Sequence, residues 1–196
     1  MAEAPTTGGG LPGRSRHFVF LDRDGVINVE RGDYTTSIDE WEWAPGALEG
    51  IRTLTEAGFE IIVVTNQSCI SRGILTEEEL ERIHDYMRRT VHEEGGDILR
   101  VYHCPHQKAD NCSCRKPEPG MLLAAAEEFG INLADTFFIG DAPRDMEAAA
   151  RAGVRSIFID TTSARMNGDS LEPVRYEFRA DNLIDAVGIV IRETFS

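Results

Sequence analysis

The chain has 196 residues, 41% hydrophobic and 28% charged, with a formal net charge of −14 at pH 7. This size and composition predict one soluble globular domain, and the acidic balance argues against nucleic acid and anionic membranes as partners. No apolar run approaches the ~20 residues of a membrane span, and no signal peptide is visible, so we expect a cytoplasmic protein.

Residues 1–16 are rich in glycine, proline and threonine, which predicts a disordered leader before a single domain over residues 17–196. In that domain, short apolar runs alternate with stretches that begin or end at proline or glycine, as helices do. The pattern predicts an α/β fold with a doubly wound parallel sheet. The expected strands are 18–22, 59–65, 98–102, 136–140 and 155–159. The expected helices are 45–58, 76 to about 92, 120–130, 143–153 and 181–195.

Carboxylates stand where two of these strands end. The run FVFLDRDG (18–25) ends with Asp22 and Asp24, and TFFIGD (136–141) ends with Asp141. In open α/β sheets, ligands bind outside the carboxyl ends of the strands. Two carboxylates in such a place suit a nucleophile and a proton carrier, with a metal ion to neutralise them.

Five motifs together carry a family resemblance that covers roughly residues 16 to 160. They are LDRDGVIN (21–28), VTNQSCISRG (64–73), YHCPH (102–106), CSCRKPEPGM (112–121) and IGDAPRDMEAA (139–149). The chain resembles the haloacid-dehalogenase (HAD) superfamily of phosphohydrolases, and more closely its capless branch of heptose bisphosphate and histidinol phosphatases. This resemblance implies a HAD-like Rossmannoid fold and a Mg²⁺-dependent phosphomonoesterase with an aspartyl-phosphate intermediate.

The resemblance also implies roles for the acidic residues. Asp22 would be the nucleophile, and Asp24 would carry protons to the leaving group and from water. The carboxylates of Asp22 and Asp141 and the backbone carbonyl of Asp24 would hold Mg²⁺, which prefers oxygen ligands.

Phosphate binding is expected from residues on the second strand and after the cysteine motif. Thr65, Lys116 and the backbone N–H near Asn66 would contact the transferring phosphoryl group. Arg115 is a candidate for a second phosphate. Asp145 would orient Lys116 or a metal-bound water, or would simply be an acid in the first turn of a helix.

Three thiols and one imidazole lie within eleven residues. Cys₃His is an accepted tetrahedral zinc set, although the C-x-H and C-x-C spacings alone also permit a disulfide or free thiols. The resemblance implies a structural Zn²⁺ that holds the loop leading into Lys116. The expected ligands are Cys104, His106, Cys112 and Cys114, with His103 as a rival for His106; Cys69 is expected to be a small packed residue.

The spacing of the motifs leaves no room for a separate cap domain, so loops 28–44 and 103–114 should shape the pocket. We expect Trp41 and Trp43 in the first loop to pack rather than to contact substrate.

The substrate inference rests on RKPEPGM after the cysteine loop and on TNQS-x-I-x-RG, which favour removal of one phosphate from a heptose 1,7-bisphosphate. Two features complicate it: the cysteine loop is short, and Ala142 stands where heptose phosphatases often carry lysine. Histidinol-phosphate phosphatase is the first alternative. A non-catalytic HAD-like binding module is the alternative from another class, but it would be expected to lose Asp22 or Asp24. We expect a monomer that binds a small phosphorylated metabolite, with Arg72 as a further candidate for a second phosphate.

Overall fold

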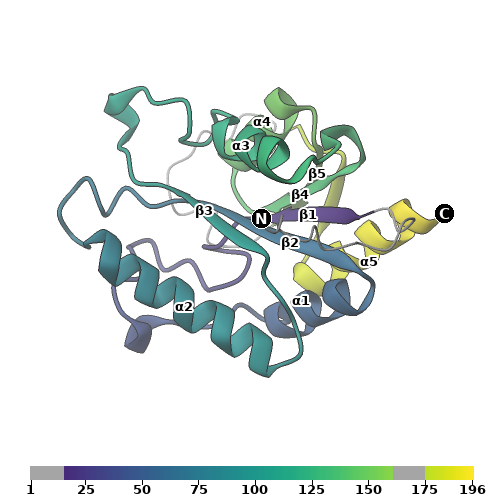
Figure 1. The fold of residues 1–196 in the computed structure, drawn as a ribbon, viewed down its shortest axis with the longest axis horizontal. Helices are drawn as coiled ribbons and strands as arrows, with labels where there is room; N and C mark the ends of the chain where they lie inside the picture. Colours follow the sequence, from purple (N-terminus) through teal and green to yellow (C-terminus); the bar gives the residue numbers. More distant parts are fainter. Residues whose placement is uncertain (1–15, 161–174) are drawn as a thin grey trace, which may run out of the picture.

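A computed structural model describes residues 16–160 and 175–196, so most of the leader lies outside the described residues. Six strands, all paired in parallel, form one sheet in the order β3-β2-β1-β4-β5-β6 (Figure 1). The strands are β1 (His17–Leu21), β2 (Phe59–Asn66), β3 (Arg100–Cys104), β4 (Phe137–Gly140), β5 (Arg155–Ile159) and β6 (Phe178–Ala180). The predicted α/β class with a parallel, doubly wound sheet is confirmed.

Helices cover both faces of the sheet because successive side chains of a buried strand point to opposite faces. Val19 and Leu21 of β1 pack in one core cluster with residues of α1 (Ala47–Glu56), α2 (Glu77–Glu93) and α5 (Leu183–Phe195). Phe18 and Phe20 pack in a second cluster with α3 (Gly120–Phe129) and α4 (Pro143–Ala152).

The strand order reverses between β1 and β4. From β1 the chain proceeds outward through β2 and β3, and β4 then returns to the other side of β1. This reversal is the place where open α/β sheets bind ligands, because the loops after the two central strands diverge there. Asp22 and Asp141 are the first residues after β1 and β4.

Two elements differ from the sequence prediction. The third strand runs over Arg100–Cys104 instead of 98–102, so Cys104 closes β3 and is paired with Asn66. Ile98, which we had placed in the strand, is buried in the core just before it. The strand β6 was not predicted, because three residues are too few to show an alternating pattern.

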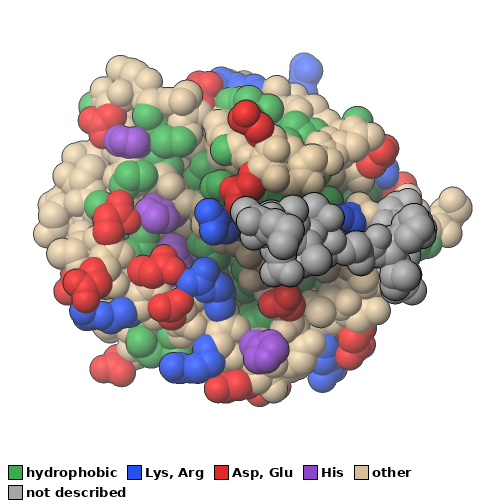
Figure 2. All heavy atoms as spheres, viewed as in Figure 1, with side chains coloured by type: hydrophobic (Ala, Val, Ile, Leu, Met, Phe, Trp, Pro, Cys, Tyr) green, Lys and Arg blue, Asp and Glu red, His purple; other side chains and the backbone are tan. Residues whose placement is uncertain are grey.

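No cap domain is inserted within residues 16–160 or 175–196, as predicted. Nor is any helix in those ranges long and apolar enough to cross a bilayer. On the face drawn in Figure 2, acidic and basic side chains are interspersed.

The core of the α3 face can be tested with two neighbouring leucines. Leu122 is 1% exposed and Leu123 is 48% exposed on the same helix. We expect Leu122→Ala to lower the free energy of unfolding by about 2–5 kcal/mol, because it leaves a cavity. The matched control Leu123→Ala should change it by less than about 0.5 kcal/mol. Urea unfolding measures both, and equal losses would contradict the packing described.

Candidate active site

A buried lysine connects the ends of the central strands. Lys116 is 3% exposed, and its Nζ lies 2.8 Å from Asp22 Oδ1, 2.8 Å from Asp145 Oδ1 and 2.9 Å from the Val64 carbonyl oxygen. The contact to the Val64 carbonyl is a hydrogen bond, and the contacts to the two carboxylates are ion pairs. Lys116 therefore neutralises two buried carboxylates that come from β1 and α4.

The side chain of Asn66 fixes the backbone of Lys116. The Asn66 Nδ2 donates to the Lys116 carbonyl at 3.0 Å, and the Lys116 N–H donates to Asn66 Oδ1 at 3.0 Å. This paired contact joins the end of β2 to the segment after the cysteine loop. Asn66 was expected to contribute its backbone N–H to phosphate binding; its side chain has this positioning task, which the sequence did not indicate.

The environment of Asp22 raises the pKa of its carboxyl group to about 7. Burial is the main cause, and the negative charge of Asp145 adds to it, while Lys116 opposes both. Asp145 is different: although burial works against ionisation, the nearby Lys116 charge holds its pKa below the usual range. Of the two acids on Lys116, Asp145 is the ionised one, and Asp22 is poised between its two forms near neutral pH.

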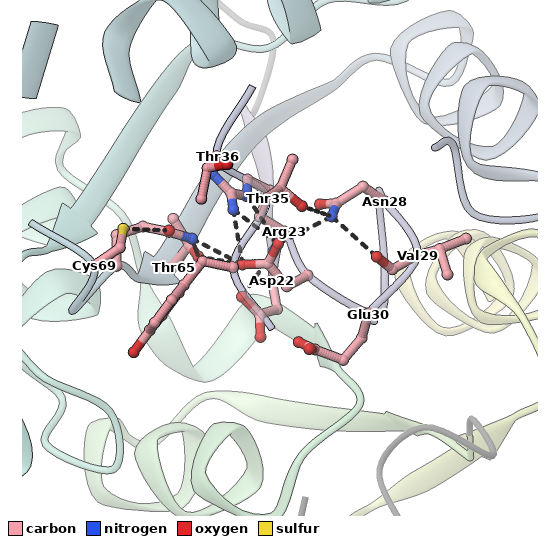
Figure 3. A network of polar contacts seen from close by, with 12 residues as sticks. Asp22, Arg23, Asn28, Val29, Glu30, Thr35, Thr36, Thr65 and Cys69 are labelled. Atoms are coloured by element: carbon pink, nitrogen blue, oxygen red, sulfur yellow. Dashed lines mark hydrogen bonds and ion pairs between the residues drawn. The ribbon is translucent and has the colours of Figure 1, made fainter. Parts of the chain in front are cut away.

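Asp24 is held by a different set of donors. The guanidinium of Arg23 donates to Asp24 Oδ1 at 2.8 Å and to Oδ2 at 3.0 Å, and the amides of Asn28 and Gln67 donate at 3.0 and 2.8 Å (Figure 3). The hydroxyl of Thr65 lies 3.5 Å away. Burial opposes ionisation, but Arg23 and these amides hold the pKa of Asp24 below its usual range.

Three carboxylates meet where a cation could bind. Oxygen atoms of Asp22, Asp141 and Asp145 all lie within 4.8 Å of one another. We had expected Asp22, Asp24 and Asp141 as the metal-binding set. The side chain of Asp24 is instead engaged by Arg23 and lies outside this cluster. The set is rich in the oxygen ligands that Mg²⁺ prefers.

Gly25 makes this approach of the carboxylates possible. Its φ is +84°, and a Cβ built on it would lie 1.9 Å from Asp141 Oδ2. Glycine is needed here both for the left-handed backbone and for the close approach.

A cleft of about 360 Å³ opens beside this cluster, and Asp22 is the carboxylate of the cluster that lines it. Asp24, Thr65, Asn66, Arg72 and Arg115 line it as well. The remaining lining residues include Glu30, Asp33, Tyr34 and Arg144.

Arg144 was missed by the sequence analysis. It lies in the first turn of α4, three residues after Asp141, and its charge lowers the pKa of Asp22. An arginine at the start of the helix after a strand-end aspartate is the signal that could have revealed it. Arg144 and Arg115 also line a second, adjoining cleft of about 600 Å³.

The two tryptophans pack, as expected. The rings of Trp41 and Trp43 lie 5.2 Å apart, and Trp41 also contacts the ring of Tyr86 on α2. Both are partly buried against the core, and neither lines the cleft over Asp22.

The cysteine loop forms a compact cluster of the four expected ligand atoms. The measured separations among Cys104, Cys112 and Cys114 Sγ and His106 Nδ1 are between 3.2 and 3.6 Å. Around a tetrahedral zinc with Zn–S bonds of about 2.3 Å, sulfur atoms lie roughly 3.8 Å apart. The cluster is thus consistent with a zinc-binding loop, and all four cysteines are free thiols.

The rival ligand and the fourth cysteine lie elsewhere. The Nε2 of His103 is 2.8 Å from Glu77 Oε2, so its ring is directed to α2. Cys69 is fully buried beside Leu75 and Ile83, as expected for a small packed residue.

The comparisons with known proteins agree with this geometry. A D-glycero-beta-D-manno-heptose-1,7-bisphosphate 7-phosphatase from Pseudomonas aeruginosa is 42% identical over 147 residues, which cover 75% of this chain and 83% of the relative. The chain belongs to this family of heptose bisphosphate phosphatases. A Photorhabdus laumondii relative named for the alpha anomer is 37% identical over 73% of this chain and 81% of its own length.

Further matches support the same family. The HAD-hydrolase-like family model matches residues 113–186. The crystal structure of the D,D-heptose 1,7-bisphosphate phosphatase from Bordetella bronchiseptica, complexed with magnesium and phosphate, superposes with a TM-score of 0.83 at 34% identity, covering 90% of this chain and 99% of that one. The predicted family is therefore confirmed.

Gly25 offers a test of the site geometry, because Gly58 has nearly the same φ, +86°, but no atom within 4 Å of a built Cβ. Alanine at either position should cost about 1–2 kcal/mol of stability from backbone strain. Only Gly25→Ala should also displace Asp141 and abolish Mg²⁺-dependent phosphatase activity. Denaturant unfolding and initial rates measure the two effects. Normal activity in Gly25→Ala would show that the close approach is dispensable.

Proposed function

We propose that the chain is a Mg²⁺-dependent phosphatase that removes the 7-phosphate from a D-glycero-D-manno-heptose 1,7-bisphosphate. The observation that carries this proposal is the buried Asp22–Lys116–Asp145 arrangement beside Asp141, with Asp22 itself lining a cleft that three arginines also line. The names of the relatives support the substrate, and the magnesium and phosphate in the Bordetella bronchiseptica structure support the chemistry.

Asp22 is the nucleophile in this proposal. Lys116 and the Arg23 backbone N–H both contact Oδ1, at 2.8 and 2.7 Å. We therefore assign the attack on phosphorus to Oδ2. The new bond from Oδ2 to phosphorus forms as the bond to the sugar oxygen breaks, and water later releases phosphate from the aspartyl-phosphate.

A divalent cation bound by Asp22, Asp141 and the Asp24 carbonyl would let an anionic nucleophile meet an anionic phosphate. The residues fit this task because carboxylate oxygens of Asp22 and Asp141 lie within 4.8 Å of each other, and Asp22 lines the cleft.

Asp24 moves protons in both steps. Since Arg23 and the amides favour its ionised form, the described conformation suits the second step, in which Asp24 takes a proton from the attacking water. In the first step Asp24 protonates the leaving sugar oxygen. Asp24 must therefore take up a proton before the bond between phosphorus and that oxygen breaks.

The cations of the cleft favour a doubly phosphorylated substrate. Lys116 is buried and already contacts two carboxylates and a carbonyl of the protein, so a second phosphate needs other cationic partners. Arg72, Arg115 and Arg144 line the cleft and can supply them. A heptose bisphosphate has two groups for these arginines, whereas histidinol phosphate has one.

The central test is phosphate release followed by ³¹P NMR. With Mg²⁺, the wild-type protein should release the phosphate at C7 and leave the one at C1. We expect Asp22→Asn to lower the rate by at least about 1,000-fold, a typical cost of removing a nucleophile. The control Asp97→Asn changes an exposed acid that does not line the cleft and should retain activity.

A faster reaction with histidinol phosphate would replace the proposed substrate by the first alternative. Normal turnover by Asp22→Asn would refute the assignment of the nucleophile.

The pH dependence of Mg²⁺ binding offers a further test. Only ionised Asp22 can serve as a ligand, and its pKa is raised to about 7. Affinity should therefore be lost as the pH falls through 7, by about 10-fold between pH 8 and pH 6. Calorimetric titrations with Mg²⁺ at both values would measure it, with Asp22→Asn as the control that should lose this pH dependence. An affinity that does not change with pH in the wild type would contradict the raised pKa.

We also propose that the cysteine cluster holds one structural Zn²⁺, since four protein ligands leave no position for water. Elemental analysis should give one zinc per chain, and Cys112→Ser should lose most of it together with thermal stability. Cys69→Ser, which changes the cysteine outside the cluster, should keep its zinc. Equal zinc content in both variants would disprove these ligands.

A further inference from the structure

Arg23 is a buried cation between the two catalytic aspartates that does not line the cleft. It is 1% exposed, although Asp22 and Asp24 on either side of it both face the substrate space. Its Nε and Nη2 atoms donate to Asp24, and the ring of Trp41 lies 5.9 Å from its guanidinium carbon. Arg23 therefore acts on the reaction through Asp24 and not through contact with substrate.

The Nη1 atom of this guanidinium, which does not contact Asp24, lies next to a histidine of α2. The Nη1 of Arg23 lies 3.3 Å from Nε2 of His84, which is 0% exposed. Burial lowers the pKa of His84 to about 2, and the adjacent Arg23 charge adds to this effect. The imidazole is neutral, and because the guanidinium can only donate, Nε2 is the acceptor and Nδ1 carries the proton.

The surroundings of Nδ1, the second ring nitrogen, indicate that His84 has a role besides packing. Its Nδ1 has no hydrogen-bond partner among the described residues, and Glu81 Oε2 lies 3.9 Å away. His103 on β3 is the other ring close by, at 5.8 Å. Burying the unpaired Nδ1–H is unfavourable, and an apolar side chain of similar size would avoid this cost. Packing alone therefore does not explain a histidine at position 84, whereas the hydrogen bond that Nε2 accepts from Arg23 does.

We propose that His84 is a positioning residue: its Nε2 holds the buried guanidinium of Arg23, which in turn holds the Asp24 carboxylate at the cleft. This inference rests on the proposed function. The guanidinium is a rigid planar fork, so fixing its Nη1 edge fixes the edge that binds Asp24. Without an acceptor at that edge, the guanidinium must tilt, and Asp24 moves with it. Proton transfer depends steeply on such placement.

Glutamine and asparagine at position 84 separate this role from general packing. Glutamine can place an oxygen where Nε2 was, but the asparagine side chain is one carbon shorter. His84→Gln should keep kcat close to wild type. His84→Asn should lower kcat by about 10-fold or more with little change in KM, because Asp24 and not substrate binding is disturbed. Circular dichroism checks folding, and His84→Met replaces the asparagine variant if that variant does not fold.

A second measurement is independent of activity. Hydrogen exchange of the Arg23 Nε–H, followed by ¹⁵N NMR and assigned with Arg23→Lys, should be slow in the wild type and in His84→Gln, and faster by about 10-fold or more in His84→Asn. If the wild type does not hydrolyse the bisphosphate, the proposed function fails and the exchange rates alone decide this inference. Equal kcat in the two variants, or equal exchange rates, would overturn it.

Discussion

The site depends on one buried ammonium group. Lys116 neutralises Asp22 and Asp145, which are 3% and 0% exposed and could not both stay buried and ionised without it. Asp141 lies in the same cluster, and the charge of Arg144 also acts on Asp22 and Asp145. The same arrangement raises the pKa of Asp22 and lowers that of Asp145, so one acid is poised to react and the other holds the lysine.

The surrounding structure serves to place this lysine. Asn66 binds its backbone from the end of β2, and the cysteine cluster closes the loop that precedes it. A Cβ on Gly120, just after this segment, would lie 2.3 Å from the Ser113 carbonyl oxygen, so the loop also packs tightly on the start of α3. A zinc ion in the loop would thus act on the reaction at a distance, through the position of Lys116.

Features that depend on local sequence were predicted well. Asp22 and Asp141 stand directly after apolar runs and Asp24 follows two residues after Asp22; the alternation of runs and helices predicts a parallel sheet whose carboxyl ends share one edge. Of the contacts between residues distant in sequence, the one between Asp145 and Lys116 was among the expectations, but two others were not predicted. Arg23 and His84 are 61 positions apart in the sequence. Asn66, whose side-chain amide hydrogen-bonds to the backbone of Lys116, is 50 positions from it. The start of β3 was misplaced because Ile98 is as apolar as a strand residue, although it fills the core before the strand begins.

The most direct test of this account is to trap the covalent intermediate. The protein would be mixed with the heptose 1,7-bisphosphate and Mg²⁺, quenched in acid within milliseconds and reduced with borohydride, which converts an aspartyl-phosphate to homoserine. Peptide mass spectrometry should then find homoserine at position 22 and nowhere else. Turnover without any modified carboxylate, or modification at Asp141 or Asp145 instead, would contradict the assignment of Asp22 as the nucleophile held by Lys116.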